Sequence, residues 1–320
     1  MADETLKETA KAPLKRPADT RVLVIGAGTM GSGIAEVFGR AGCETTIVEP
    51  DPARRQAALA RLEQIGARCK AAPAPEEADL PAIDLAVECA PERLALKQAL
   101  FGQLARRLRP DALLCSNSSS FPISDIAQGL PGPERMLGLH FFMPAPRIPL
   151  VEVVLGAGSS PALGEALCDF MRDCGMVPVL VRKDLPGFLA NRLQHALARE
   201  AFALVDAGIV SPEDVDAAVR FGFGMRFLAA GPMLQRDHNG LDVHHAAAAS
   251  IYPSLANDTQ PGPMLSALAA AGKFGLKSGA GIYDWQGGKA AAERRRYDQA
   301  LEAALAQLAR DLPPRQAGQD

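Results

Sequence analysis

Short apolar runs alternate with amphipathic segments through residues 21–182. The runs lie at 22–25, 45–48, 83–88, 112–115, 136–139, 150–155 and 177–181. Continuous apolar runs of this length are typical of strands that are buried on both faces. The segments at 52–71, 91–108 and 162–174 have the periodicity of helices. This alternation predicts an α/β fold, with a doubly wound parallel sheet covered by helices.

The pattern changes at Lys183, after which helical periodicity dominates. An apolar stripe with helical spacing comprises Leu189, Leu193, Leu197, Ala201 and Leu204. Gly208 is expected to end this helix. Ser211 is followed by Pro, Glu and Asp, which supplies the hydroxyl cap, proline and carboxylate that begin another helix. We therefore predict an α/β domain at 21–182 and an all-helical domain at 183–320.

The two ends of the chain have a different character from both domains. Residues 1–20 mix acidic and basic side chains with prolines and lack an apolar segment. They are predicted to form a disordered arm, and they resemble neither a secretory signal nor a transit peptide. The alanine-rich segment beyond Lys289 is predicted to be an exposed helix that frays.

Composition narrows the possible functions. The 320 residues carry a formal net charge of −3, which provides no basic field for nucleic acid. No apolar run is long enough to cross a membrane. The six cysteines show no C-x-x-C and no spacing that would bind a metal, so reduced thiols in a cytoplasmic protein are expected.

Residues 26–31 contain a glycine motif at the end of the first predicted strand. Gly26, Gly28 and Gly31 form G-x-G-x-x-G where that strand must turn into a helix. Glycines in this order allow a tight turn, close approach of a pyrophosphate and close helix–strand packing. Glu49 ends the second strand, where a carboxylate binds an adenosine ribose and disfavours a 2′-phosphate. The sequence thus predicts a Rossmann-type NAD site, with NADP left open by Arg54 and Arg55.

Three polar clusters are expected near the carboxyl ends of the strands, where ligands of open α/β sheets bind. They are Ser116–Ser120, His140 and Asn191. Glu152 lies in the strand after that of His140, so its carboxylate can orient the imidazole and raise its basicity. The free ring nitrogen can then accept the proton of an alcohol while the carbinol hydrogen leaves as hydride. The pattern favours a hydride-transfer enzyme that acts on a small molecule.

Six segments resemble the L-3-hydroxyacyl-CoA dehydrogenase family, in its order, over about residues 20–285. They are Gly26-Ala-Gly-Thr-Met-Gly, Ser116-Asn-Ser-Ser-Ser, Gly138-Leu-His-Phe-Phe, Leu150-Val-Glu-Val-Val, Asp184-Leu-Pro-Gly-Phe-Leu-Ala-Asn-Arg and Lys273-Phe-Gly-Leu-Lys-Ser-Gly. The resemblance implies that His140 is the general base and Glu152 its partner, with Ser119 and Asn191 holding the substrate. The implied cofactor-binding residues are Gly26, Gly28, Thr29, Met30, Gly31, Glu49, Glu92, Lys97, Asn117 and Lys277. It also implies a homodimer formed by the helical domain.

Two departures from the family pattern concern the substrate. Met143 stands where the usual segment reads His-Phe-Phe-Asn-Pro, so the pocket is expected to be more apolar there. The 33 residues 50–82 are fewer than in CoA-specific members, which carry a longer Lys-rich hairpin; Arg61, Arg68 and Lys70 are the remaining candidates for phosphate contacts. The segment 200–216 resembles relatives that oxidise free hydroxy acids such as gulonate, carnitine or a pyridine carboxylate alcohol. The substrate is therefore either an L-3-hydroxyacyl-CoA or a small free hydroxy acid.

Two further interpretations remain. Dehydrogenases similar to the 6-phosphogluconate enzymes place a lysine four residues before the helix asparagine, where this chain has Gly187. A nucleotide-binding protein without turnover, of the crystallin kind, is disfavoured by the presence of both His140 and Glu152.

Overall fold

The computed structural model describes residues 14–312, which divide into two compact units. Of the described residues, one unit contains 14–190 and Leu312, and the other is Asn191–Asp311. The sequence placed the boundary at 183, but the segment that follows is tied to the sheet. Asp184 N donates to Leu155 O (3.1 Å), and the side chain of Phe188 is buried in the core.

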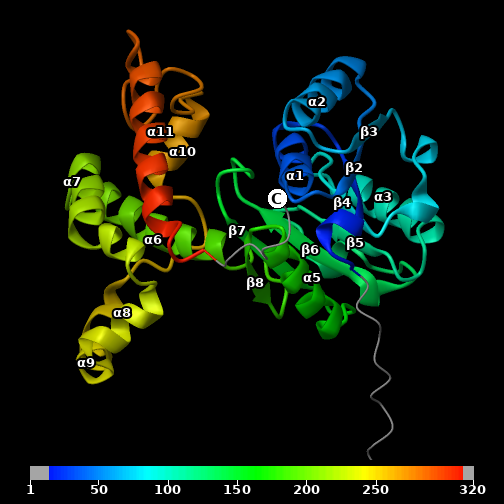
Figure 1. The fold of residues 1–320 in the computed structure, drawn as a ribbon. Helices are drawn as coiled ribbons and strands as arrows, with labels where there is room; N and C mark the ends of the chain where they lie inside the picture. Colours follow the sequence, from blue (N-terminus) through cyan, green and yellow to red (C-terminus); the bar gives the residue numbers. More distant parts are fainter. Residues whose placement is uncertain (1–13, 313–320) are drawn as a thin grey trace, which may run out of the picture. The chain divides into compact units, whose positions relative to one another are not determined.

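An eight-stranded sheet organises the first unit (Figure 1). Its strands are β1 (Arg21–Ile25), β2 (Glu44–Val48), β3 (Cys69–Ala72), β4 (Leu85–Glu88), β5 (Leu113–Ser116), β6 (Met136–Phe141), β7 (Leu150–Leu155) and β8 (Val177–Val181). The order across the sheet is β3-β2-β1-β4-β5-β6-β7-β8. The seven predicted strands are all present, and the α/β fold with a helical C-terminal part is confirmed.

Two details of the sheet differ from the prediction. β7 pairs antiparallel with β6, so the sheet is mostly rather than entirely parallel. The connection 142–149 is too short for the crossover that parallel neighbours need. The helix predicted at 52–71 ends at Gln64, and β3 follows it as an eighth strand. Gly66, with φ +70°, supplies the left-handed turn after that helix.

Helices cover both faces of the sheet, as a doubly wound fold requires. They are α1 (Thr29–Arg40), α2 (Pro52–Gln64), α3 (Leu94–Arg107), α4 (Ile123–Ile126) and α5 (Pro161–Asp173). α1, α2 and α5 pack on one face in a core cluster with β-strand residues such as Val22 and Val24. α3 and α4 pack on the other face with the alternate residues Leu23 and Ile25. Successive side chains of one strand thus enter separate cores.

Residues 14–20 belong to the segment predicted as a disordered arm, but they have a defined structure. Pro17–Asp19 form a 3₁₀ turn, and the Thr20 hydroxyl donates to the Arg16 carbonyl (3.0 Å). Leu14 packs against the core, and Thr20 is fully buried. The remainder of the arm lies outside the described residues.

The second unit is built from helices. They are α6 (Ala190–Asp206), α7 (Pro212–Ala217), α8 (Pro232–Asn239), α9 (Leu241–Ile251), α10 (Pro263–Ala270) and α11 (Lys289–Leu308), with short π and 3₁₀ segments at Ala218–Phe223, Gly224–Leu228 and Tyr252–Ser254. The predicted cap is present, since Ser211 Oγ accepts from Asp214 N (3.1 Å). Across residues 14–312 no helix combines the length and apolarity needed to cross a bilayer.

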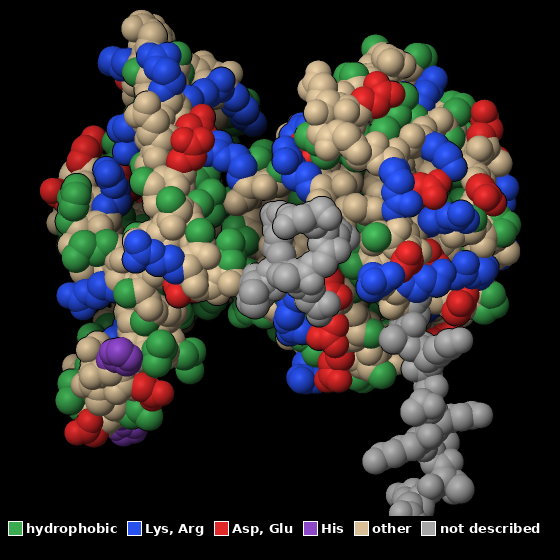
Figure 2. All heavy atoms as spheres, in the orientation of Figure 1, with side chains coloured by type: hydrophobic (Ala, Val, Ile, Leu, Met, Phe, Trp, Pro, Cys, Tyr) green, Lys and Arg blue, Asp and Glu red, His purple; other side chains and the backbone are tan. Residues whose placement is uncertain are grey.

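The helical unit lacks an interior of its own. Not one of residues 191–311, all of which the structure describes, is buried. Phe221 is 70% exposed and Met233 is 81% exposed. Figure 2 shows hydrophobic side chains on the surface in the region of α7 and α8.

Candidate active site

The glycine turn joins β1 to α1 and lies against the end of β4. Gly26 has φ +99°, and a Cβ there would lie 2.9 Å from Cys89 O. A Cβ on Gly31 would overlap the carbonyl oxygen of Gly26. These two glycines are therefore required by the turn itself. Gly28 differs, because a Cβ on it would meet nothing within 4 Å and its φ is −65°.

The surroundings of Gly28 fit a dinucleotide phosphate. Gly28 caps the twelve-residue helix α1, whose first residues are Thr29 and Met30. The free N–H groups and the positive end of the dipole at a helix start attract phosphate. Since no protein atom uses the space beside Gly28, the absence of a side chain there suits the approach of a ligand rather than packing.

Glu49 follows β2 at the same edge of the sheet. Its Oε2 accepts from Ala27 N (2.8 Å), and its Oε1 accepts from Asp51 N (3.0 Å). Each carboxylate oxygen has a further lone pair, so Glu49 can still accept hydrogen bonds from a ribose diol. Arg55, which kept NADP open, donates to the carbonyl oxygen of Glu49 (2.6 Å).

His140 and Glu152 form a buried cross-strand pair. The antiparallel register of β6 and β7 places the two residues directly opposite each other. His140 Nδ1 lies 2.8 Å from Glu152 Oε2, and both side chains are buried. The other carboxylate oxygen accepts from Leu189 N (3.0 Å) and Ala190 N (2.8 Å). The carboxylate is thereby fixed from both sides.

The charge of Glu152 determines which ring nitrogen of His140 carries the proton. Burial opposes ionisation, but the hydrogen bonds from His140 and Ala190 hold the pKa of Glu152 below its usual value. An ionised carboxylate only accepts, so the hydrogen resides on Nδ1. Nε2 is then an acceptor, 3.0 Å from Ser119 Oγ. The rings of Phe142 and Phe188 flank the imidazole edge-on at 4.7 and 5.5 Å between centroids.

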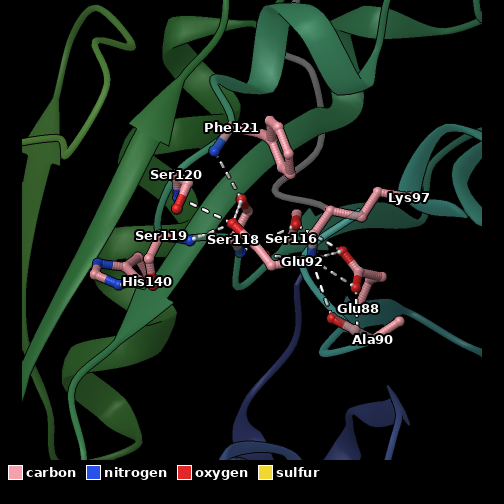
Figure 3. Close-up of polar contacts among 10 residues, drawn as sticks. All are labelled: Glu88, Ala90, Glu92, Lys97, Ser116, Ser118, Ser119, Ser120, Phe121 and His140. Carbon is pink, nitrogen blue, oxygen red and sulfur yellow. Dashed lines mark hydrogen bonds and ion pairs between the residues drawn. The ribbon is translucent and has the colours of Figure 1, made fainter. Parts of the chain in front are cut away.

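Glu92 organises the serine turn that carries Ser119 (Figure 3). Its Oε1 accepts from Ser118 Oγ (2.5 Å), Ser119 N (3.2 Å) and Ser120 N (3.0 Å). Partial burial favours the neutral acid, yet the hydrogen bond from Ser118 and the charge of Lys97 lower the pKa of Glu92. An ionised Glu92 therefore holds the backbone of the turn.

A buried ion pair contacts the second carboxylate oxygen of Glu92. Lys97 Nζ lies 3.0 and 3.1 Å from the two carboxylate oxygens of Glu88 and 3.1 Å from Glu92 Oε2. Glu88 also accepts from Ser116 Oγ (2.7 Å) and Ala90 N (2.6 Å). Glu88 was not among the site residues predicted from the sequence, although it lies at the carboxyl end of a strand, as Glu49 does.

Asn117 lies between the serine turn and β6, the strand that carries His140. Its Oδ1 accepts from Phe141 N (2.8 Å), and its own N–H donates to the Glu88 carbonyl (2.9 Å). The carboxamide thus joins the end of β5 to the end of β6, next to His140.

Two predicted site residues belong to the helical unit. Asn191 is the second residue of α6 and directly follows Ala190, whose N–H binds Glu152. Lys277 lies over the ring of Phe274, 5.0 Å from its centroid, and lines an apolar cavity of about 500 Å³. In the part of the chain that the structure describes, no group of three or more His, Cys, Asp or Glu side chains is placed to hold a metal.

A glycine turn with open space at a helix start, and a buried histidine–carboxylate pair at the same sheet edge, are the features of a dinucleotide-dependent dehydrogenase. Comparisons identify the family. Residues 21–185 match the family model of the 3-hydroxyacyl-CoA dehydrogenase NAD binding domain, and residues 187–285 match that of its C-terminal domain. The chain belongs to the 3-hydroxyacyl-CoA dehydrogenase family, and it is an NAD-dependent oxidoreductase.

Individual relatives differ in their substrates. A 5-formyl-3-hydroxy-2-methylpyridine 4-carboxylate 5-dehydrogenase of Mesorhizobium japonicum is 32% identical over 82% of this chain and 89% of the relative. A 3-hydroxybutyryl-CoA dehydrogenase of Mycobacterium tuberculosis is 35% identical over 83% of this chain and 98% of the relative. A crystal structure of an enzyme of the first kind, described as an NAD+ dependent dismutase, has a TM-score of 0.81 at 30% identity, and the match covers 89% of this chain and 96% of that one.

Proposed function

We propose that the protein oxidises the hydroxyl group of a 3-hydroxy acid to a carbonyl, with His140 as general base. The observation that carries this proposal is the buried imidazole held at Nδ1 by Glu152 and open to an acceptor role at Nε2. Nε2 takes the hydroxyl proton, and the imidazolium that forms is stabilised by the Glu152 carboxylate. NAD, held by the glycine turn and Glu49, would supply the hydride acceptor for the carbinol hydrogen. Ser119 is the group that orients the substrate oxygen.

His140→Ala tests this assignment. Turnover is expected to fall at least about a hundredfold, which is the contribution of a general base. The affinity for NADH, measured by fluorescence titration, is expected to stay unchanged, because His140 belongs to the proton-transfer site and not to the glycine turn. Comparable turnover in the folded variant would contradict the proposal. Reduction of NAD should be assayed in parallel with NADP.

We infer that the substrate is a small free acid rather than a CoA ester. The three candidates for phosphate contacts in the shortened segment 50–82 are already engaged. Arg61 pairs with Glu36 (2.5 Å) and Lys70 with Glu44 (2.6 Å), while Arg68 donates to two backbone carbonyls. Because these side chains are already bound within the protein, they give only weak support for a site that binds the phosphates of CoA. The similarity to a pyridine carboxylate dehydrogenase supports the free acid.

The two substrate forms are separated by kinetics. Free 3-hydroxy acids and 3-hydroxybutyryl-CoA are assayed at several chain lengths with NAD. A higher kcat/KM for free acids is expected, and Arg68→Ala should leave the kcat/KM of either form unchanged. A CoA ester that is preferred, and that loses affinity in Arg68→Ala, would instead support an acyl-CoA substrate.

We also propose that the protein is a homodimer in which a second copy covers the helical unit. Within the part of the chain that the structure describes, all of the exposed large hydrophobic side chains except Met143, Leu185 and Leu189 lie in residues 191–311. A unit of this size without a buried residue cannot be stable by itself, because burial of apolar surface is the main favourable term in folding. Sedimentation equilibrium is expected to give the mass of a dimer. Thermal unfolding is expected to show a melting temperature that rises with protein concentration. A stable monomer would refute this.

We propose a cytoplasmic location for the protein, and the six free cysteines support it, because a reducing compartment keeps thiols unpaired.

A further inference from the structure

Lys97 has no donor left for a ligand. An ammonium group carries three N–H donors. Four acceptors surround Nζ: the two oxygens of Glu88 at 3.0 and 3.1 Å, Glu92 Oε2 at 3.1 Å and Ala90 O at 3.3 Å. The side chain is 1% exposed. The resemblance to the family implied that Lys97 binds the cofactor, but the contacts in this chain point to another role.

The ion pair between Glu88 and Lys97 joins β4 to α3. Glu88 ends β4, and Lys97 lies in the first turn of α3. Glu92, in the connection between them, is the member that reaches the serine turn (Figure 3). Glu88 and Lys97 neutralise each other, which leaves Glu92 with its charge and with one carboxylate oxygen directed at Ser118, Ser119 and Ser120.

These contacts set the position of Ser119. Its backbone N–H is fixed by Glu92, and its hydroxyl lies 3.0 Å from His140 Nε2. Ser119 is exposed, and among residues 14–312 its hydroxyl has no other hydrogen-bond partner that would set its rotation. Its neighbour Ser118 is fully buried, and its hydroxyl both donates to Glu92 and accepts from Phe121 N. The position of the hydroxyl therefore depends on the backbone of the turn.

We propose that Lys97 and Glu88 are positioning residues that act through Glu92 to hold Ser119 against His140. This proposal rests on the proposed function, because it concerns the same proton-transfer site. It predicts a loss of turnover without a loss of cofactor affinity when the ion pair is removed.

The test is the double variant Glu88→Gln/Lys97→Met. Lys97→Met alone would leave a buried, unpaired carboxylate and so destabilise the protein for a trivial reason. The double variant removes both charges and keeps the side-chain volumes. We expect near-normal melting, an NADH affinity within about twofold, and a kcat reduced about tenfold or more, toward that of Ser119→Ala.

Combining the double variant with Ser119→Ala shows whether the ion pair acts through Ser119. If the pair acts through Ser119, adding Ser119→Ala to the double variant causes little further loss of kcat. If Lys97 contacted the cofactor instead, the NADH affinity would fall and the two losses would multiply. Either a normal kcat in the folded double variant or multiplying losses would overturn the proposal.

A matched control exists on the same two elements. Asp84 precedes β4 and pairs with Arg109, just after α3, at 3.0 Å. Asp84→Asn/Arg109→Met removes the ionic link between β4 and α3 at the opposite edge of the sheet. It is expected to lower the melting temperature and leave kcat unchanged. A similar loss of kcat in this control would mean that any loosening of α3 has the same effect, which would refute a specific role.

A second readout does not require turnover. With ¹⁵N-labelled histidine, Ser119→Ala is expected to shift the His140 Nε2 resonance, because a hydrogen bond is lost. The Glu88→Gln/Lys97→Met variant should reproduce that shift, and an unchanged resonance would overturn the positioning role. Turnover that persists in His140→Ala would instead refute the proposed function, so the two failures are distinguishable.

Discussion

Glu152→Gln changes the proton arrangement of the site with little change in shape. One carboxylate oxygen accepts from Leu189 N and Ala190 N, at 3.0 and 2.8 Å. In glutamine this atom must be the amide oxygen, because an amide NH₂ there would face two N–H donors. The NH₂ group is then directed at His140 Nδ1, where the carboxylate oxygen lay at 2.8 Å.

The magnitude follows from this forced orientation. An NH₂ group donates, so Nδ1 must accept and the ring hydrogen moves to Nε2. Nε2 can no longer take the alcohol proton, and the imidazolium loses its counter-charge. We expect kcat to fall by about 10²–10⁴, near the upper end because a reversed tautomer in a serine-protease triad costs about 10⁴. One charge-assisted hydrogen bond is worth about 1.5–3 kcal/mol, which is less than the stability of a typical domain.

Single-turnover kinetics with NAD measure the expected loss, and NADH fluorescence titration should show an unchanged dissociation constant. Glu36→Gln is the matched control, since Glu36 is a buried carboxylate in α1 that pairs with Arg40 and Arg61. That variant should lose stability and keep its kcat. A folded Glu152→Gln enzyme with turnover within about threefold of the wild type, against the 10²–10⁴ expected of a general base, would refute the reasoning.

Three further predictions concern the glycine turn, Met143 and the pH dependence of stability. Gly28→Ala is expected to weaken NADH binding at least about tenfold with an unchanged melting temperature, whereas Gly31→Ala should cost about 1–3 kcal/mol of stability through steric overlap; equal behaviour of the two would contradict the distinction. Met143→Asn, at an exposed position, should alter kcat/KM and change stability by less than about 0.5 kcal/mol. The folded-state pKa values of Glu92 and Glu152 lie below the usual 4.5, so both carboxylates stabilise the protein above that pH and lose this effect as the pH falls further. Urea titrations should therefore show a steeper loss of unfolding free energy below about pH 4.5 in the wild type than in Glu152→Gln.

The main-chain architecture was largely predictable, because strands buried on both faces leave continuous apolar runs. β3 was missed for a physical reason. Its sequence, Cys-Lys-Ala-Ala, contains no β-branched or aromatic residue, and the strand exists because it completes the pairing of β2. The direction of β7 was available from the length of the 142–149 connection, which permits only an antiparallel neighbour.

The site was predictable in part. His140 and Glu152 end up opposite each other because they lie on consecutive paired strands, which spacing can suggest. Ser119 could not be separated from its serine neighbours by sequence pattern, since only the turn geometry shows which hydroxyl reaches Nε2. Lys97 has the sequence context of an ordinary lysine in the first turns of a helix, and its burial depends on Glu88 nine residues earlier.

One segment of the chain contacts both the glycine turn and the serine turn. The segment from Glu88 to Glu92 packs against the glycine turn, where a Cβ on Gly26 would lie 2.9 Å from Cys89 O, and it also holds the serine turn through Glu92. His140 is consequently set from both sides by ionised carboxylates. Glu152 acts directly on Nδ1, and Glu92 acts on the Nε2 side through Ser119. The two carboxylates are anchored to different parts of the chain, since Glu92 belongs to the segment that contacts the glycine turn, whereas Glu152 is held by Leu189 N and Ala190 N.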